Sequence, residues 1–285
     1  SEAAAAGWTV GPDILAAGHA LSITGGHIDP AMFIGSAEGV LLLTPEHGIA
    51  DGVDEVVRAT RFQLKHGARV IKISATAGVM SLEASVGAQQ YTEEEMRAAV
   101  EEAERHGIGV AAHAHGAAGI NAAIRAGVAS IEHGSLLDDE SIQLFKEHGT
   151  FLVPTTGLTD VIKVDGLPTP IQAKANYVLP LARENLERAI DAGVRIAVGS
   201  DAPLIPHGEN AREVYALVER GMSVADALRA ATINGAELLR LEDRGRLAEG
   251  LRADIIAVDG DPLEDLESLS RVSFVMKQGQ VLKTP

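Results

Sequence analysis

One pattern recurs along the chain: a polar segment of helical periodicity ends in glycine, and a short apolar run follows almost at once. Glycine is favoured just beyond a helix C-terminus because it adopts a positive φ without steric strain. The apolar runs are too short for helices and fit buried strands. The five glycines are Gly67, Gly107, Gly127, Gly149 and Gly193, and the strands predicted after them cover residues 69–73, 108–112, 128–131, 151–153 and 194–198.

Helices with clear boundaries separate these strands. We predict them over residues 51–65, 92–105, 139–147 and 181–191, and Thr92 with Glu95 forms a capping box for the second one. A further strand over residues 10–17 precedes the series, which gives six strands. Helices that alternate with short apolar strands indicate an α/β protein whose parallel sheet is covered by helices. A chain of 285 residues is long enough for a (β/α)8 barrel, which needs about 250.

The C-terminal part of the chain has a different pattern. Three successive helices are predicted over residues 209–220, 223–232 and 235–239, on the far side of the barrel. Strands are then predicted over residues 253–258, 272–277 and 281–283, and the last two form a hairpin. So few short strands cannot build a core of their own. We expect this small sheet to pack on strands supplied elsewhere.

Composition excludes several classes of function. The chain has 24 basic and 40 acidic residues, a net charge of −16, so its surface repels nucleic acid. Residues 110–131, the longest weakly charged stretch, contain two His and an Arg, so we predict no membrane span. We assign no compartment. Because there is no Cys, any metal must be held by residues such as His and carboxylates, and ten His are present.

Four polar residues lie at or near the ends of predicted strands. They are Lys72, His113, His133 and Asp201. A single His at a strand end is more often structural than a ligand, and an Asp before a loop often caps a helix. A Lys in an apolar strand pairs with a buried carboxylate, reaches the surface or is chemically modified. Because all four fall at the same end of successive strands, where parallel α/β folds build their sites, we favour a shared functional site.

These residues and their neighbours resemble the amidohydrolase superfamily of metal-dependent hydrolases. The strings that carry the resemblance are VIKISATAGV, VAAHAHG, IEHGS and VGSDAP, and it covers essentially the whole chain. The chain is similar to the branch of dipeptidases and carboxypeptidases that cleave Xaa-Pro or C-terminal Lys and Arg substrates. The strings for that branch are GPDILAAGHALSITGGH, PHGEN and the tail from GRLAEGLRADIIAVDGDP to VSFVMKQGQVLK.

The resemblance implies a role for each of the four residues. Lys72 would be carboxylated to a carbamate that bridges two divalent metals, most often zinc. His113 and His133 would hold the more exposed metal, and Asp201 would contact the other metal. Asp201 would also pass a proton from the attacking water to the leaving amine. The implied reaction is hydrolysis of an amide or peptide bond, releasing a C-terminal amino acid.

Further polar residues are candidates for substrate binding. His27 follows a glycine turn, His115 lies two residues beyond His113, and His207 and Asn210 lie in the loop after the last strand. Each also has a structural interpretation as a turn, loop or helix-start residue. We expect a small peptide or amide as substrate, with no nucleic acid or membrane partner, and a homo-oligomeric assembly. The loop with His207 and the acidic charge favour substrates with a basic C-terminal residue.

The sequence departs from the superfamily pattern at its first two strands. Residues 10–17 align with the third strand, and the His-x-His pair that ends the first strand has no counterpart. We therefore expect an incomplete barrel of about six of eight strands over residues 1–243, and the C-terminal part of a small β-sandwich domain over residues 244–285. A missing N-terminal segment or a second chain would complete the site, and the polypeptide alone would be nearly inactive.

Other functions stay open. An amidase acting on N-acyl aromatic amino acids is plausible for relatives of this branch. A deaminase of the same superfamily is a rival, but Lys72 argues against it because such sites generally use one metal and no strand-borne Lys. A non-catalytic half-barrel that serves only in interactions is the alternative from another class.

Overall fold

Four parallel strands form the central sheet. The computed structural model describes residues 3, 6–31, 43–83 and 85–285. The strands are β1 (Ile71–Ser74), β2 (Val110–Gly116), β3 (Ser130–Leu136) and β4 (Phe151–Val153), and they lie in sequence order. Each neighbouring pair is parallel, with Ser74 opposite His113 and His113 opposite Glu132. Their carboxyl ends therefore meet at one edge of the sheet.

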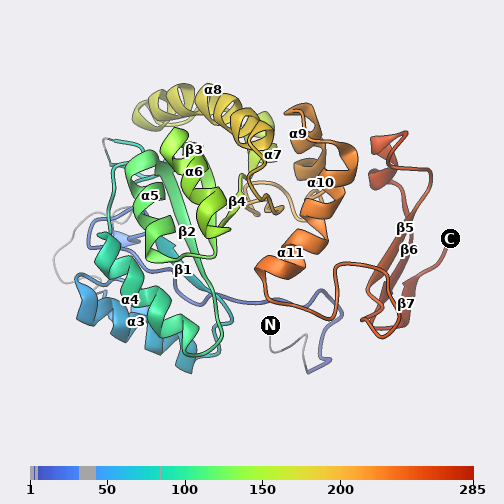
Figure 1. The fold of residues 1–285 in the computed structure, drawn as a ribbon, viewed down its shortest axis with the longest axis horizontal. Helices are drawn as coiled ribbons and strands as arrows, with labels where there is room; N and C mark the ends of the chain where they lie inside the picture. The colour runs from blue at the N-terminus through green and yellow to red at the C-terminus, as the bar shows by residue number, and fades with distance from the viewer. Residues whose placement is uncertain (1–2, 4–5, 32–42, 84) are drawn as a thin grey trace.

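Helices cover the outside of this sheet, as predicted (Figure 1). They are α3 (Val53–Lys65), α4 (Glu93–Glu104), α5 (Ala117–Ala126) and α6 (Asp139–His148). The predicted capping box of α4 is present, because Thr92 accepts from the Glu95 amide and Glu95 accepts from the Thr92 amide. All five predicted helix-ending glycines have positive φ, between 69° and 95°. The α/β class and the βα alternation are thus confirmed.

Two of the six predicted strands are not strands. Residues 10–17 run as irregular backbone, and the chain pairs with β1 only afterwards, through a single parallel bridge between Leu21 and Ile73. Residues 194–198 likewise contribute one bridge, between Ile196 and Leu152 of β4. An apolar β-branched run becomes a strand only where a neighbour offers a continuous ladder, and here residues 194–198 meet the sheet at one point while residues 10–17 lie before the bridge of Leu21.

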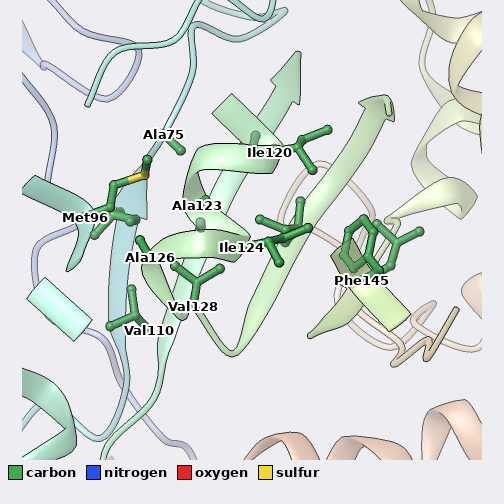
Figure 2. Packing of buried hydrophobic residues seen from close by; sticks show 14 of the residues in the cluster. Ala75, Met96, Val110, Ile120, Ala123, Ile124, Ala126, Val128 and Phe145 are labelled. Carbon is green, nitrogen blue, oxygen red and sulfur yellow. The ribbon is translucent and has the colours of Figure 1, made fainter. Parts of the chain in front are cut away.

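The core lies between the sheet and the helices α4 to α6. Figure 2 shows Met96, Val110, Ile120, Ile124 and Phe145 interdigitated there. The chain has few aromatics, 3% of its residues, and its core is built largely from Ile, Val, Leu and Ala. Alanines let helix and strand backbones approach closely, so the strand ends are held firmly in place.

Five more helices follow β4. They are α7 (Thr156–Val161), α8 (Thr169–Asp191), α9 (Arg212–Glu219), α10 (Val224–Ala231) and α11 (Ile233–Leu238). The helix predicted over residues 181–191 is thus longer than expected: α8 continues through Pro180 and packs against β3. In the ranges that the structure describes, no helix combines the length and apolar character needed to cross a bilayer.

The predicted small sheet is present at the C-terminus. Strands β5 (Ile255–Val258), β6 (Val272–Lys277) and β7 (Gln280–Lys283) pair antiparallel in that order. Two short 3-10 helices, Pro45–His47 and Leu266–Ser270, complete the described elements. Asp13 joins the N-terminal segment to this end of the chain by ion pairs with Arg252 at 2.8 Å and Lys277 at 3.0 Å.

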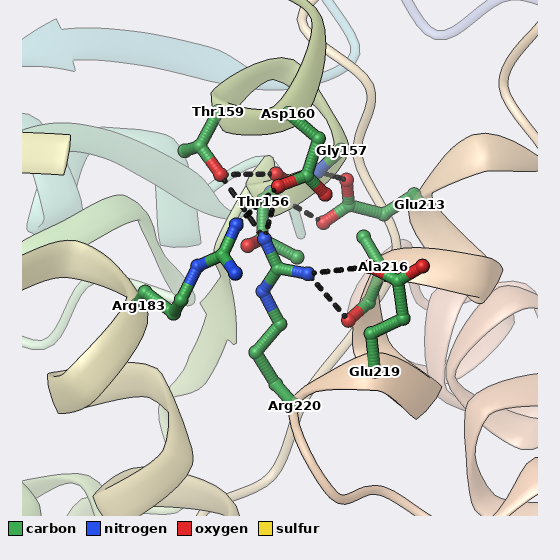
Figure 3. A network of polar contacts seen from close by, with 9 residues as sticks. All are labelled: Thr156, Gly157, Thr159, Asp160, Arg183, Glu213, Ala216, Glu219 and Arg220. Atoms are coloured by element: carbon green, nitrogen blue, oxygen red, sulfur yellow. Dashed lines mark hydrogen bonds and ion pairs between the residues drawn. The ribbon is translucent and has the colours of Figure 1, made fainter. Parts of the chain in front are cut away.

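A buried polar network fastens α7 to α9 (Figure 3). The Glu213 carboxylate accepts the backbone N–H of Thr156 at 2.8 Å and that of Gly157 at 2.6 Å. Arg220, 3% exposed, donates to Asp160 at 2.5 Å. Burial raises the pKa of Glu213 to about 7, although the two N–H donors and Arg220 favour its charged form. The network thereby fixes the start of α7.

Glu213 makes stability depend on pH in a defined direction. Its pKa is about 7 in the folded chain and about 4.5 when exposed, so between these values the folded state binds a proton that the unfolded state lacks. Its contribution to stability is complete below about pH 4.5 and is lost as pH rises through 7, up to about 3 kcal/mol. Urea unfolding near pH 5 and pH 8 should show a larger loss for the native chain than for Glu213→Gln. Equal losses in both proteins would contradict this assignment.

Candidate metal centre

The carboxyl edge of the sheet carries the predicted site residues. Lys72 lies on β1, His113 and His115 on β2, and His133 on β3. Side chains two residues apart on a strand share a face, so His113 and His115 point to the same side. Lys72 is opposite Ala111 in the register and joins that side. The sheet thus brings side chains from three strands to one place.

His133 reaches this cluster through an unusual backbone conformation. His113 is opposite Glu132, so in a regular strand the next residue, His133, would point to the other face. The φ of His133 is 71°, which breaks the alternation and is followed by a positive φ at Gly134. Thr155 and Asp201 also have positive φ, 51° and 52°. Such non-glycine conformations cost about 1–3 kcal/mol each and concentrate at functional sites.

Four imidazole rings gather at this edge. The ring centroids of His113 and His133 are 4.7 Å apart, and those of His115 and His133 are 4.9 Å apart. His27 comes from the N-terminal segment and stacks on His113 at 4.3 Å. One ligand atom from each of His113, His115 and His133 lies within 4.8 Å of the other two, a spacing that fits a shared metal ion.

The Nδ1 atoms of His133 and His115 have hydroxyl partners, which leaves the Nε2 atom of each ring available to a metal. The Thr155 hydroxyl donates to the Pro154 carbonyl at 2.7 Å, so it must accept from His133 Nδ1 at 2.7 Å. The Nε2 of a neutral His133 therefore keeps its lone pair. The Nδ1 of His115 is 2.9 Å from the Ser135 hydroxyl. Ligating His residues are commonly oriented in this way through their second nitrogen.

Two imidazole nitrogens in this cluster are buried without a hydrogen bond. Among the described residues, His113 Nε2 and His27 Nδ1 have no partner. A buried nitrogen left unpaired costs about 1–3 kcal/mol, so its presence needs an explanation. Burial lowers the pKa of His115 to about 3 and the pKa of His113 and of His133 well below the usual value. The rings are neutral at pH 7, which is the form that binds metals.

Charged groups lie beside the rings. Burial lowers the pKa of Lys72, and the carboxylates of Glu132 and Asp201 act in the opposite direction. Asp201 is open to the cavity, but protein atoms crowd its carboxylate, and this desolvation raises its pKa against the effect of Lys72. Lys72 and Asp201 therefore influence each other electrostatically within one site.

A cavity of about 350 Å³ opens above these groups. Lys72, His27, the three clustered His and Asp201 form its polar floor. Its walls are mostly apolar and come from α7, α8 and the loop after β1. The apolar side chains that line it are Ile28, Val79, Met80, Leu158, Ile162, Ala175, Val178, Leu179, Ala182, Leu186 and Leu204. The cavity thus combines a polar floor with mostly apolar walls.

The structure brings together six of the eight predicted site residues. Lys72, His113, His133, Asp201, His27 and His115 all line the cavity. His207 and Asn210 lie on an exposed loop and are absent from the described lining. Sequence reasoning missed Thr155, whose signal was its place two residues beyond the end of β4, and it gave His115 a substrate role although its ring lies within the metal-type cluster.

Solved structures share this fold. A Xaa-Pro dipeptidase with bound methionine in its active site superposes with a TM-score of 0.93 at 40% identity, over 99% of this chain and 71% of that one. A prolidase complexed with N-methylphosphonate-L-proline gives a TM-score of 0.89 at 34% identity, over 100% of this chain and 72% of that one. The predicted barrel-type fold agrees with these structures.

Sequence comparison gives the same relationship. Ochratoxinase of Aspergillus niger is 39% identical over 298 aligned residues, which cover 98% of this chain and 62% of the relative. The chain thus spans less than two thirds of the length of that enzyme. The model of the amidohydrolase family matches residues 2–282. With a family model matched over nearly its whole length, the chain belongs to the amidohydrolase family.

Proposed function

We propose that this chain carries a metal-binding part of a hydrolase that cleaves amide bonds with a divalent metal. The observation that carries the proposal is the neutral imidazole cluster of His113, His115 and His133, together with Lys72 and Asp201 on the floor of one cavity. The relatives support it, because their names describe a dipeptidase, a prolidase and an ochratoxinase. A non-catalytic half-barrel would have no need of three strained backbone positions around the cavity.

The residues present fit a divalent metal. Neutral imidazole nitrogens and a carboxylate are the ligands that zinc accepts in proteins that lack Cys ligands. The unpaired Nε2 of buried His113 is the kind of atom that a metal would satisfy. We propose that His113 and His133 hold one zinc, with His115 beside them, and that Lys72 and Asp201 serve a second. Bound there, the metals would supply a Lewis acid that polarises the amide carbonyl and acidifies water.

Lys72 would contribute as a carbamate. Its ammonium first loses one proton; the neutral amine then attacks the carbon of CO2, an N–C bond forms as one C–O π bond becomes a carboxylate oxygen, and the nitrogen loses a second proton, so a cation is converted into an anion. The reaction needs the neutral amine, and burial lowers the pKa of Lys72 toward that form. The product gives the site the negative ligand that its imidazoles do not provide.

Asp201 is placed to move the proton of the reaction. Within the described lining of the cavity, it is the one carboxylate. Water adds to the amide carbon, the C–N bond breaks, and a proton passes from the water through Asp201 to the departing nitrogen. The products are a carboxylic acid and an amine. The raised pKa of Asp201 favours its holding that proton for part of the reaction.

The cavity favours apolar substrates over basic ones. Its walls come mainly from α7 and α8 and present Leu, Ile, Val and Ala side chains. A Lys or Arg side chain of a substrate would enter without a carboxylate partner apart from Asp201, which the reaction uses. We therefore propose peptides with an apolar residue or Pro, and N-acyl aromatic amino acids as a second candidate. The homo-oligomer stays a prediction.

Removal of Lys72 tests the metal centre. Lys72→Ala should lose bound zinc and lower any amidase activity by roughly a thousandfold or more, because the bridging anion is gone. Metal content by mass spectrometry and a carbon-13 NMR carbamate signal after exposure to labelled CO2 are the measurements. Lys146→Ala, an exposed Lys on α6, is the matched control. A Lys72→Ala protein that keeps its zinc would refute the proposed role.

The Thr155 hydroxyl tests the orientation of His133. Thr155→Val keeps the shape of the side chain but removes the acceptor of the His133 Nδ1–H. We expect zinc affinity to fall by roughly 10- to 100-fold, as is usual when a ligand loses its orienting partner. Thr155→Ser keeps the hydroxyl and should bind zinc as the native chain does. Competition with a chromophoric chelator measures both affinities, and equal affinity in the Val variant would exclude this role.

Substrate preference tests the assignment of the walls. With the zinc-loaded protein and the N-terminal part of a relative added in trans, kcat/KM for N-acyl-Phe and Xaa-Pro substrates should exceed that for Xaa-Lys and Xaa-Arg by roughly tenfold or more, since a buried unpaired ammonium is costly. A steady-state screen of the four classes gives the ranking. Preference for the basic substrates would overturn the proposal that the cavity walls select apolar groups. It would restore the expectation, based on the loop of His207, that the substrate has a basic C-terminal residue.

A further inference from the structure

A buried Lys outside the metal centre makes an unusual set of contacts. The side chain of Lys174, on α8, is 7% exposed. Its Nζ donates to three main-chain carbonyls: Gly78 at 3.0 Å, Ser81 at 2.7 Å and Glu83 at 3.0 Å. An ammonium has three donors, so every one of them is used. All three acceptors belong to one short segment far away in sequence.

That segment forms one boundary of the cavity, and we call residues 77–83 the roof segment. It follows β1, the strand that carries Lys72, and its Val79 and Met80 line the cavity. The Ala77 amide donates to the Ala88 carbonyl at 2.8 Å, which fixes one end of the segment. The bonds from Lys174 reach the other part of this irregular loop, where the Ser81 hydroxyl also donates to the Gly78 carbonyl at 3.3 Å.

The roof segment also contacts the imidazole cluster directly. Gly78 packs against His27 so closely that a Cβ at this position would lie 2.1 Å from the ring. The same ring stacks on His113. The His27 amide donates to Gln90 Oε1 at 3.1 Å, and Gln90 Nε2 donates to Glu83 Oε1 at 2.9 Å. A continuous series of contacts therefore runs from Lys174 through the roof segment to His27 and His113.

Lys174 ties this series to helix α8, which forms another part of the cavity wall. The next residue on α8, Ala175, lines the cavity, as do Val178 and Leu179 one turn further on. The roof segment and the α8 wall are thus joined by three hydrogen bonds from one buried cation. Charge-assisted bonds of this kind are stronger than bonds between neutral groups. One Lys side chain therefore bridges the roof segment and α8.

We propose that Lys174 is a positioning residue that sets substrate specificity by holding the roof segment, and with it His27, at a fixed distance from the α8 wall. The inference rests on the proposed amide hydrolysis and deepens it. Lys174 touches neither the metal ligands nor the floor groups in the described contacts. Its effect is on which apolar group of a substrate fits, and on how firmly that group is held.

The test compares variants of Lys174 in the full chain. Lys174→Met keeps the length of the side chain but removes all three bonds, whereas Lys174→Arg retains donors. Lys146→Met, at an exposed site on α6, is the matched control. If Lys174→Met does not accumulate as folded protein, Lys174→Gln, which keeps two donors, replaces it.

Hydrogen exchange gives a readout independent of activity. Amides of the roof segment in Lys174→Met should exchange roughly tenfold faster or more than in the native chain, because three bonds that close the segment are lost. Exchange in β2 and β3, and the zinc content, should stay unchanged. Native-like exchange of the roof segment in Lys174→Met would overturn the proposal even if the chain proved to have another activity.

Kinetics then separate positioning from general damage. For a bulky apolar substrate such as N-acyl-Phe, Lys174→Met should raise KM by roughly tenfold with kcat within about threefold, while N-acyl-Ala changes little. Lys174→Arg should restore most of the preference. An equal loss of kcat for both substrates would show a merely structural role and refute the specificity role. Absence of any amidase activity, even with the N-terminal part of a relative added in trans, would count against the proposed function, and the exchange result would still decide the role of Lys174.

Discussion

The parallel pairing of β2 with β1 and β3 is the constraint on which the site depends. In this register Ser74, His113 and Glu132 lie side by side, so any polar residue near the carboxyl end of one strand meets those of its neighbours. Fully buried Ile71, Ile73 and Ile131 hold the strands in that register, each contributing about 1.5–3 kcal/mol by burial. The packing offsets what the site costs: unpaired buried imidazole nitrogens and left-handed backbone at non-glycine residues.

Local signals made much of the fold predictable. Each glycine after a helix and the Thr92–Glu95 capping box act within a few residues, so they can be identified in one sequence, and they marked the ends of α3 to α6 correctly. The failures were not local. Residues 10–17 and 194–198 have strand-like composition, but a strand also needs a partner along its whole length. The N-terminal extent of α8 was missed because Pro180 suggests a boundary, whereas packing on β3 keeps the helix continuous.

The sequence predicted those site residues that lie in or next to recognisable strands. Lys72, His113, His133 and Asp201 were found because a polar residue inside or at the end of an apolar strand is conspicuous, and all four line the cavity. The positive φ of His133, which turns its ring toward His113, could not be recognised in the sequence, because a His residue by itself does not indicate a positive φ. Thr155 and Lys174 act through contacts with residues distant in sequence: His133 is 22 positions from Thr155, and Gly78 is 96 from Lys174.

Helix α8 links parts of the site that are usually considered separately. It supplies apolar wall residues, it holds the roof segment through Lys174, and its Asn185 donates to the carbonyl of Ser135, whose hydroxyl contacts His115. A shift of this helix would therefore change the width of the cavity, the place of His27 and the support of one clustered imidazole together. Effects of substitutions along α8 should not add, because residues that share partners are energetically coupled. Specificity in this fold is consequently a property of how the helix is seated on β3, as well as of the side chains that face the cavity.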